Sequence, residues 1–177
     1  MTTPRSIFGV TVHQPWPWAL AHPEKFAIPC RTLPRAFNAF AARVHGLQVH
    51  RGCLLAIHAS EQWDEDAARW IVEHTDTHVP LAQTIDRGAV VAVAELVTTS
   101  RAARDVPRPE GGAVRDPWAR TGALWYWYVR NVVPVEPVPC AGATGLWSLD
   151  VDVHARLRPA YAEGVRAMRA RLGAVAA

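Results

Sequence analysis

The feature that most constrains this fold is a set of short apolar runs, each closed by glycine, proline or a charged residue. The longest run, Ala89 to Ala94, is followed by Glu95 and lies in the segment AVVAVAELV of residues 89–97. A membrane-spanning helix needs about 20 apolar residues, so this run is far too short to cross a bilayer. Its length and its valines instead predict a buried strand over residues 89–97.

Similar runs predict the other strands, over residues 7–12, 53–58, 125–129, 132–139 and 146–149. The prolines of 132–139 (VVPVEPVP) suit an edge strand or a bend, because proline cannot donate a hydrogen bond to a neighbouring strand. Residues 100–118 hold three prolines and a glycine pair, which predicts a mobile loop.

Helical patterns fall between and after these runs. Pro15 or Pro17 opens a short predicted helix, and residues 35–45 also have helical spacing. Ser60 is the predicted N-cap of a helix whose first turns are rich in Asp and Glu. A last helix begins at about Asp152; its apolar stripe comprises Leu157, Tyr161, Val165, Met168 and Leu172. Arg158, Arg166 and Arg169 lie on the adjoining face, either as a solvated flank or as a ridge that contacts phosphate.

Five or six short strands with two to four helices predict an α+β fold built on a small mixed β-barrel. The length of 177 residues corresponds to about one domain. We expect that domain to cover residues 1–150, with the amphipathic, arginine-rich helix of residues 151–177 packed on it.

Composition narrows the class of partner without fixing it. The chain has 19 basic residues, of which only Lys25 is lysine, and it has eight tryptophans. Arginine and tryptophan suit planar, phosphate-bearing partners, although a genome biased toward arginine and alanine codons gives the same excess of arginine. Half of the residues are apolar, which excludes a disordered or fibrous chain. We expect a cytoplasmic protein, because neither a spanning segment nor a signal peptide is evident.

Metal and disulfide chemistry are not predicted. The three cysteines are widely spaced and form no CxxC pair. His74 and His78 are four residues apart, a spacing that can hold a metal on one helix face, but no third ligand accompanies them. We therefore expect no metal and no cofactor.

Two tryptophans stand at a predicted strand-to-helix corner, where each could be a stacking wall for a base or a plug of the core. These are Trp16 and Trp18, and Gln14 before them could recognise a base edge or cap the helix. Glu95 interrupts an apolar strand, so its carboxylate must be paired or face a cleft. His58 ends another strand and is expected to be a core histidine.

The order of these motifs resembles the ASCH domain family, which is named for its homology to a transcriptional coactivator, activating signal cointegrator. The pieces that carry the resemblance are Gln14-Pro15-Trp16 with Ala19, then Lys25 and Arg31, then Arg51-Gly52 before Ile57-His58-Ala59-Ser60. The later pieces are residues 88–97, residues 125–134, Pro137-Val138 and Gly145-Leu146-Trp147. The resemblance covers residues 7–150.

The resemblance implies a PUA-like β-barrel with a cleft for RNA or a modified nucleobase. Some small relatives are amidohydrolases that act on acetylated cytidine, and some are reported to cut RNA. The family's cleft motif reads Gly, any residue, Lys, two residues, Glu, any residue, Arg. In this chain Lys25 and Arg31 match the basic positions of that motif, with one extra residue between them. The motif glycine and its acid are absent, and Ile28 stands where the hydrolases have threonine, so their catalytic set is not reproduced.

The sequence therefore predicts a protein that binds RNA, another single-stranded nucleic acid or a modified nucleoside in a basic, tryptophan-walled cleft. The predicted binding residues are Gln14, Trp16, Trp18, Lys25, Arg31, Arg51, Ser60 and Trp125. The alternative is a small amidohydrolase or ribonuclease, with Lys25, Glu95 and Thr32 as its working groups. A third possibility is a protein-interaction module that docks through its C-terminal helix. We favour binding over catalysis, and we expect no membrane association.

Overall fold

The structure is a computed structural model that describes residues 6–20, 27–30, 53–100, 106–107, 113–114, 118 and 125–175. Its strands are β1 (Ile7–Gln14), β2 (Ala27–Cys30), β3 (Leu54–Trp63), β4 (Ala89–Ser100), β5 (Val106–Pro107), β6 (Ala113–Val114), β7 (Trp125–Pro139) and β8 (Leu146–Ser148). Its helices are α1 (Trp16–Ala19), α2 (Glu65–His74) and α3 (Val151–Val175), with a short 3₁₀ turn, η2 (Ala82–Thr84). The helix predicted over residues 35–45 lies outside the described residues.

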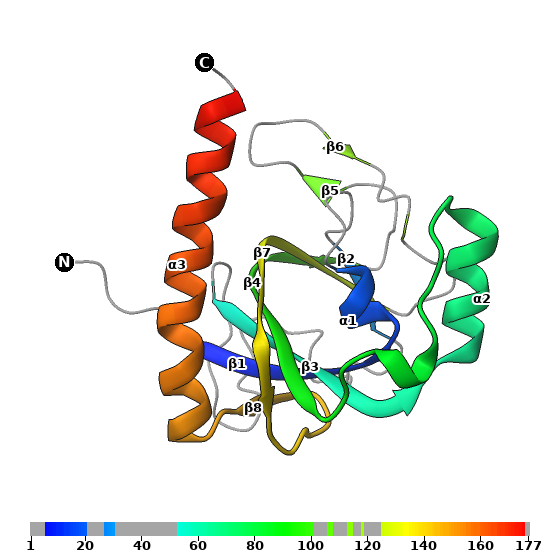
Figure 1. The fold of residues 1–177 in the computed structure, drawn as a ribbon, viewed down its shortest axis with the longest axis horizontal. Coiled ribbons are helices and arrows are strands. Elements are labelled where there is room, and N and C mark those ends of the chain that lie inside the picture. The colour runs from blue at the N-terminus through cyan, green and yellow to red at the C-terminus, as the bar shows by residue number, and fades with distance from the viewer. Residues whose placement is uncertain are drawn as a thin grey trace.

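Six strands form one curved sheet in the order β2-β7-β4-β3-β1-β8 (Figure 1). β1 and β3 run parallel and the other neighbours are antiparallel, so the sheet is mixed and the fold is α+β, as predicted. No pairing joins the end strands β2 and β8 within the described ranges, so the predicted closure into a barrel is not confirmed. Within the described residues, β5 and β6 pair with each other in a separate two-stranded sheet.

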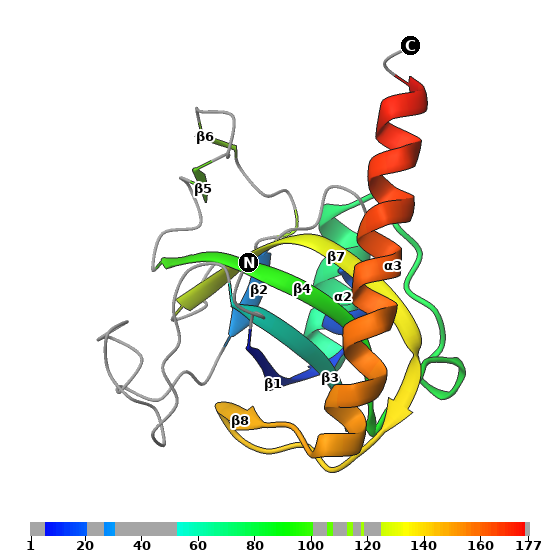
Figure 2. The same ribbon diagram turned by 90° about the vertical axis from the view of Figure 1, so that its left-hand side faces the viewer.

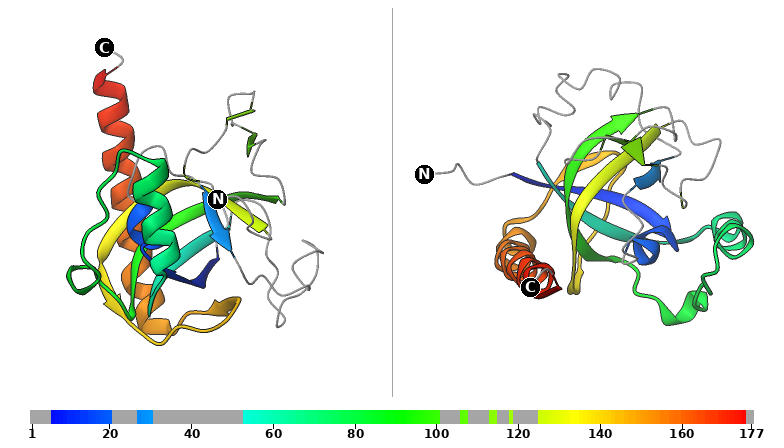
Figure 3. Two further views of the ribbon diagram at one scale, coloured as in Figure 1. Left: turned by 90° about the vertical axis from the view of Figure 1, so that its right-hand side faces the viewer. Right: turned by 90° about the horizontal axis from the view of Figure 1, so that it is seen from above.

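Helices cover both faces of this sheet (Figures 1 and 3). On one face α1 and α2 enclose a first core, which includes Phe8, Val10, Trp16, Leu55, Ile57, Ile71, Leu96, Trp127, Val129 and Leu146. On the other face α3 packs on a second core, which includes Ile7, Leu54, Ala56, Val90, Val93, Val138, Val153 and Leu157. None of the helices in the described part of the chain is long and apolar enough to cross a membrane.

The start of α2 corrects the sequence prediction. Ser60 does not cap a helix, because β3 continues through it to Trp63. The N-cap is Asp64, whose Oδ1 accepts a hydrogen bond from the Ala67 backbone N–H at 2.9 Å. Ser60 and Asp64 are both good N-cap residues followed by acids. Strand pairing decides between them, because Gln14 of β1 still pairs with Trp63 and β3 therefore continues past Ser60.

β7 is also longer than predicted. The segments expected as two strands, 125–129 and 132–139, form one strand that passes through Asn131. Asn131 has a φ of 49°, a left-handed conformation that asparagine tolerates better than most residues. Irregularities in the pairing of β7 with β4 absorb the extra residues, so the prolines do not end the strand.

Candidate functional site: a cavity beside α1

The buried side chain of Gln14 connects the segments that form the candidate site. This side chain is 1% exposed at the end of β1. The Nε2 amide donates a hydrogen bond to the Asp86 carbonyl at 2.8 Å, and Oε1 accepts one from the Trp18 backbone N–H at 3.2 Å. Of the two roles predicted for Gln14, the structure thus shows the capping role. The side chain ties the start of α1 to the turn that leads into β4.

A cavity of about 130 Å³ lies against this amide. Its lining is mostly apolar and comes from α1, from β4 and β7, and from the turn before β4. The lining residues are Gln14, Pro17, Trp18, Ile85, Asp86, Val91, Ala92, Val132 and Pro134. Two of the predicted binding residues, Gln14 and Trp18, therefore share one cavity.

Trp18 and Trp16 have different environments although they are two residues apart. Trp16 is 4% exposed and belongs to the first core, with its ring centroid 6.0 Å from that of Trp70. Trp18 is only half-buried, lines the cavity, and lies 6.4 Å from the ring of Trp118 at an interplanar angle of 58°. The core role fits Trp16, whereas Trp18 packs against the edge of that core and lines the cavity.

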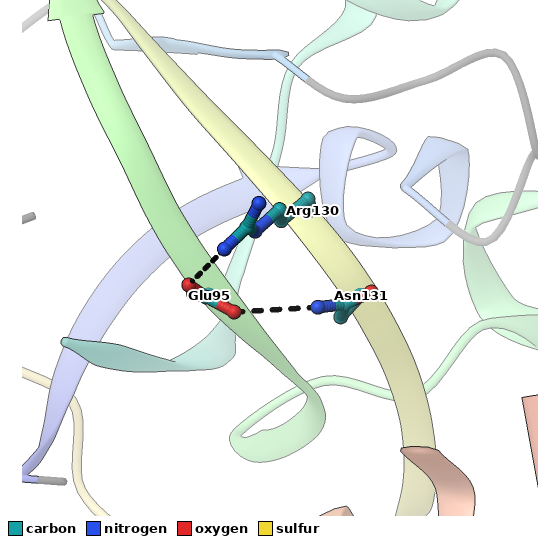
Figure 4. Close-up of polar contacts among 3 residues, drawn as sticks. All are labelled: Glu95, Arg130 and Asn131. Atoms are coloured by element: carbon teal, nitrogen blue, oxygen red, sulfur yellow. Dashed lines mark hydrogen bonds and ion pairs between the residues drawn. The ribbon is translucent and has the colours of Figure 1, made fainter. Parts of the chain in front are cut away.

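Glu95 is paired rather than free. Its Oε1 accepts a hydrogen bond from Arg130 Nη2 at 2.7 Å, and its Oε2 accepts one from Asn131 Nδ2 at 3.3 Å (Figure 4). The carboxylate side chain is 6% exposed and the arginine side chain is 43% exposed. A buried charge needs such a partner, because desolvation without one is very costly.

Glu95 also lies on the opposite face of the sheet from the cavity. Its neighbours on β4, Ala94 and Leu96, both belong to the first core. Because side chains alternate along a strand, Glu95 points to the other face, as does its partner in register, Leu54 of the second core. The structure therefore does not bring Glu95 together with Gln14 and Trp18.

The remaining predicted residues are placed as follows. Ser60 is buried in β3, where its hydroxyl accepts a hydrogen bond from the Gln62 N–H at 3.1 Å. Trp125 begins β7, with its backbone paired to Cys30 of β2; its side chain is outside the part that the structure describes. Lys25, Arg31, Thr32 and Arg51 also lie outside the described residues.

His58 is a core histidine, as expected, and is 3% exposed. Its Nε2 lies 3.0 Å from the Cys140 carbonyl, and its ring meets Trp147 edge-on at 5.8 Å. Burial raises the pKa of the Cys140 thiol above its usual value, which disfavours the reactive thiolate. In the described ranges, no three His, Cys, Asp or Glu side chains are grouped so that they could hold a metal ion.

Sequence reasoning missed the other walls of the cavity. Asp86 belongs to the turn before the strongest predicted strand, and Val132 and Pro134 belong to the segment treated as a separate edge strand. The sequence around these residues contains no motif that predicts a binding site. They lie beside α1 because β4 pairs with β7 and because Gln14 donates a hydrogen bond to Asp86.

Fold and site together define an α+β protein with an open mixed sheet and a small apolar cavity beside its first helix. No family model and no curated protein matches the chain. Among solved structures it is similar to one titled "Crystal structure of ASCH from Zymomonas mobilis". The identity is 10%, the match covers 86% of this chain and 94% of the other, and the TM-score is 0.46.

Proposed function

We propose that this protein binds single-stranded nucleic acid, RNA foremost, by taking one base or modified base into the cavity beside α1. The observation that carries the proposal is that Trp18, half-buried at a strand-to-helix corner, lines a cavity with the buried amide of Gln14. Stacking of a base on an aromatic side chain is worth about 1–3 kcal/mol. The resemblance of the motif order to the ASCH family supports the same function.

The size of the cavity supports a ligand of one ring. Its volume is about 130 Å³. A dry protein cavity of about 150 Å³ is known to accept benzene, so this one suits a single six-membered ring such as a pyrimidine. The lining is apolar apart from Gln14 and Asp86, as is usual for sites in which a few polar groups orient a ligand.

The polar residues of the lining have different parts in this proposal. The Gln14 amide is engaged with Asp86 and Trp18, so it fixes the shape of the cavity. Asp86 is exposed, and its carboxylate is the group that would accept a hydrogen bond from an exocyclic amino group of a base. Lys25, Arg31 and Arg51 are proposed to contact phosphate, as expected from the sequence.

The hydrolase alternative gains no support from Glu95, the acid proposed for it. Its carboxylate is held by Arg130 and Asn131 on the face of the sheet that does not carry the cavity. A general acid or base must lie within hydrogen-bond reach of the group on which it acts. We therefore propose binding without catalysis.

The proposal is tested by titrating a fluorescently labelled 12-nucleotide single-stranded RNA of mixed sequence with the protein and with Trp18→Ala. We expect the Kd to rise about 5- to 150-fold in the variant, which corresponds to the removal of one stacked base. Trp70→Ala is the matched control, because Trp70 is also half-buried but does not line the cavity. Equal affinities of wild type and Trp18→Ala would overturn the proposal.

A further inference from the structure

The C-terminal half of α3 presents arginines on a side that the sheet does not cover. The first half of the helix packs Val153 and Leu157 into the second core, and Gly164 lies against Val133 of β7. The C-terminal part of the helix extends past the sheet (Figure 2). Arg166 and Arg169 follow Gly164 closely in sequence, and both are exposed.

These two residues and Arg158 form the arginine ridge. At about 100° per residue, Arg158 and Arg169 lie within about 20° of one another around the helix axis, and Arg166 lies about 60° further. All three are turned by about 100° or more from Leu157, which is buried against the sheet. Arg169 follows Arg158 by eleven positions, so the ridge is about 16 Å long.

The charges of Arg166 and Arg169 are available to a ligand. Neither residue has a carboxylate within ion-pair distance in the part of the chain that the structure describes. Arg69 of α2, by contrast, is 3.7 Å from Asp66. The nearest acid in sequence, Glu163, is exposed and forms no ion pair within the same described part.

Arg158 has a different role in the ridge. It is half-buried, and its Nε lies 3.4 Å from His154 Nε2. Arg158 follows the buried Leu157, so it marks the end of the ridge nearest the second core, whereas Arg166 and Arg169 mark the end nearest the C-terminus of α3.

We infer that the arginine ridge binds the phosphodiester backbone of a nucleic acid strand, at a surface separate from the cavity beside α1. Guanidinium groups match phosphate oxygens in a two-pronged geometry, which favours arginine at such contacts. The exposed neighbours Ala162 and Ala170 on this side are small, so a backbone can approach the helix closely.

The same side lacks what a lipid or an apolar protein partner would need. Within residues 151–170, the part of α3 whose side chains the structure describes, the large apolar residues are at least half-buried, apart from Val151 at the start of the helix. Membrane-surface helices insert a wide apolar face, and protein interfaces centre on apolar or aromatic anchors. Charge complementarity therefore favours phosphate groups of nucleic acid as the occupant.

This inference does not depend on the cavity, because the two surfaces lie on opposite faces of the sheet. Val132 lines the cavity, while its neighbour Val133 contacts Gly164 of α3. A strand bound along the ridge contributes affinity that depends on salt and not on base identity.

The test measures the Kd for a labelled 20-nucleotide oligouridine across a series of salt concentrations, using the full chain and three variants. For the double variant Arg166→Gln/Arg169→Gln we expect weaker binding at low salt. The slope of log K against log salt should be shallower by about 1.4, or about 0.7 for each phosphate that is no longer neutralised. Glu163→Gln should bind more tightly, because it removes a carboxylate close to Arg166.

Arg69→Gln is the control for the loss of an exposed arginine charge elsewhere, since it removes one such charge from α2, where Arg69 is paired with Asp66. A slope unchanged in the double variant, or reduced as much per charge by Arg69→Gln, would overturn the inference. A different pair of results would also overturn the inference. Vesicles containing phosphatidylserine would bind the wild type but not the double variant, and oligouridine would bind both proteins equally. Failure of the cavity proposal looks different, because Trp18→Ala would then leave affinity unchanged while the ridge variants still alter the slope.

Discussion

The two faces of the sheet are packed in different ways. On the α1 side, the aromatic side, the core packs large rings, among them Trp16, Trp118 and Trp127, with aliphatic side chains, and a cavity of about 130 Å³ lies beside Trp18. On the α3 side the core is aliphatic, and Gly164 allows the helix backbone to approach Val133. Among the described residues, the aromatic side therefore combines the larger core with a cavity, whereas the aliphatic side is a smaller core with the α3 backbone packed close to β7.

The largest expected change in stability comes from a substitution in the core on the aromatic side. Trp16→Ala should lower the free energy of unfolding by about 3–5 kcal/mol, because it empties a fully packed site in the first core. Urea unfolding measures this decrease. Trp18→Ala should cost clearly less, since Trp18 is half-buried at the cavity. Equal decreases for the two variants would mean that Trp18 is as much a core residue as Trp16.

The aliphatic side is tested by Gly164→Ala. In an exposed helix this change stabilises, because glycine costs about 0.5–1 kcal/mol relative to alanine. Here a Cβ would overlap Val133 Cγ1, so we expect a net destabilisation of about 1–2 kcal/mol in urea unfolding. In a Val133→Ala background the same change should be neutral or stabilising. A stabilising effect of Gly164→Ala alone would show that α3 is packed less closely than the structure indicates.

The smallest expected effect concerns α2, which contributes Ala67 and Ile71 to the aromatic side. Asp64→Ala should cost about 1 kcal/mol, because it removes the acceptor for the Ala67 N–H. Ser60→Ala should cost less than about 0.5 kcal/mol, since the Ser60 hydroxyl only closes a local turn with Gln62. Thermal unfolding followed by circular dichroism distinguishes them, and the reverse order would restore Ser60 as the helix cap.

Much of the fold follows from local sequence, and the wrong predictions have specific causes. The strand at residues 89–97 and the helix from about Asp152 were predictable, because long periodic or continuously apolar segments carry their own signal. The start of α2 was not, since Ser60 and Asp64 are equivalent as caps until β3 is paired. The continuity of β7 depends on one residue, Asn131, and on irregular pairing that its sequence does not show.

The sequence predicted only those residues of the cavity that come from one short segment. Gln14 and Trp18 are close in sequence, and both line the cavity. Asp86, Val132 and Pro134 reach it through tertiary contacts alone. Glu95 was correctly expected to be paired or to face a cleft, but only its position on β4 shows that it is turned away from this cavity.

The hydrogen bond from Gln14 to Asp86 has a consequence for folding. It joins residues 72 positions apart, so the cavity wall is complete only after nearly half of the chain has come together. Such long-range contacts form late, once the entropy of closing the intervening loop has been offset. A ligand that binds in the cavity therefore binds the native state and not early folding intermediates. At ligand concentrations above Kd, the melting temperature of the whole domain should rise in proportion to the logarithm of the ligand concentration.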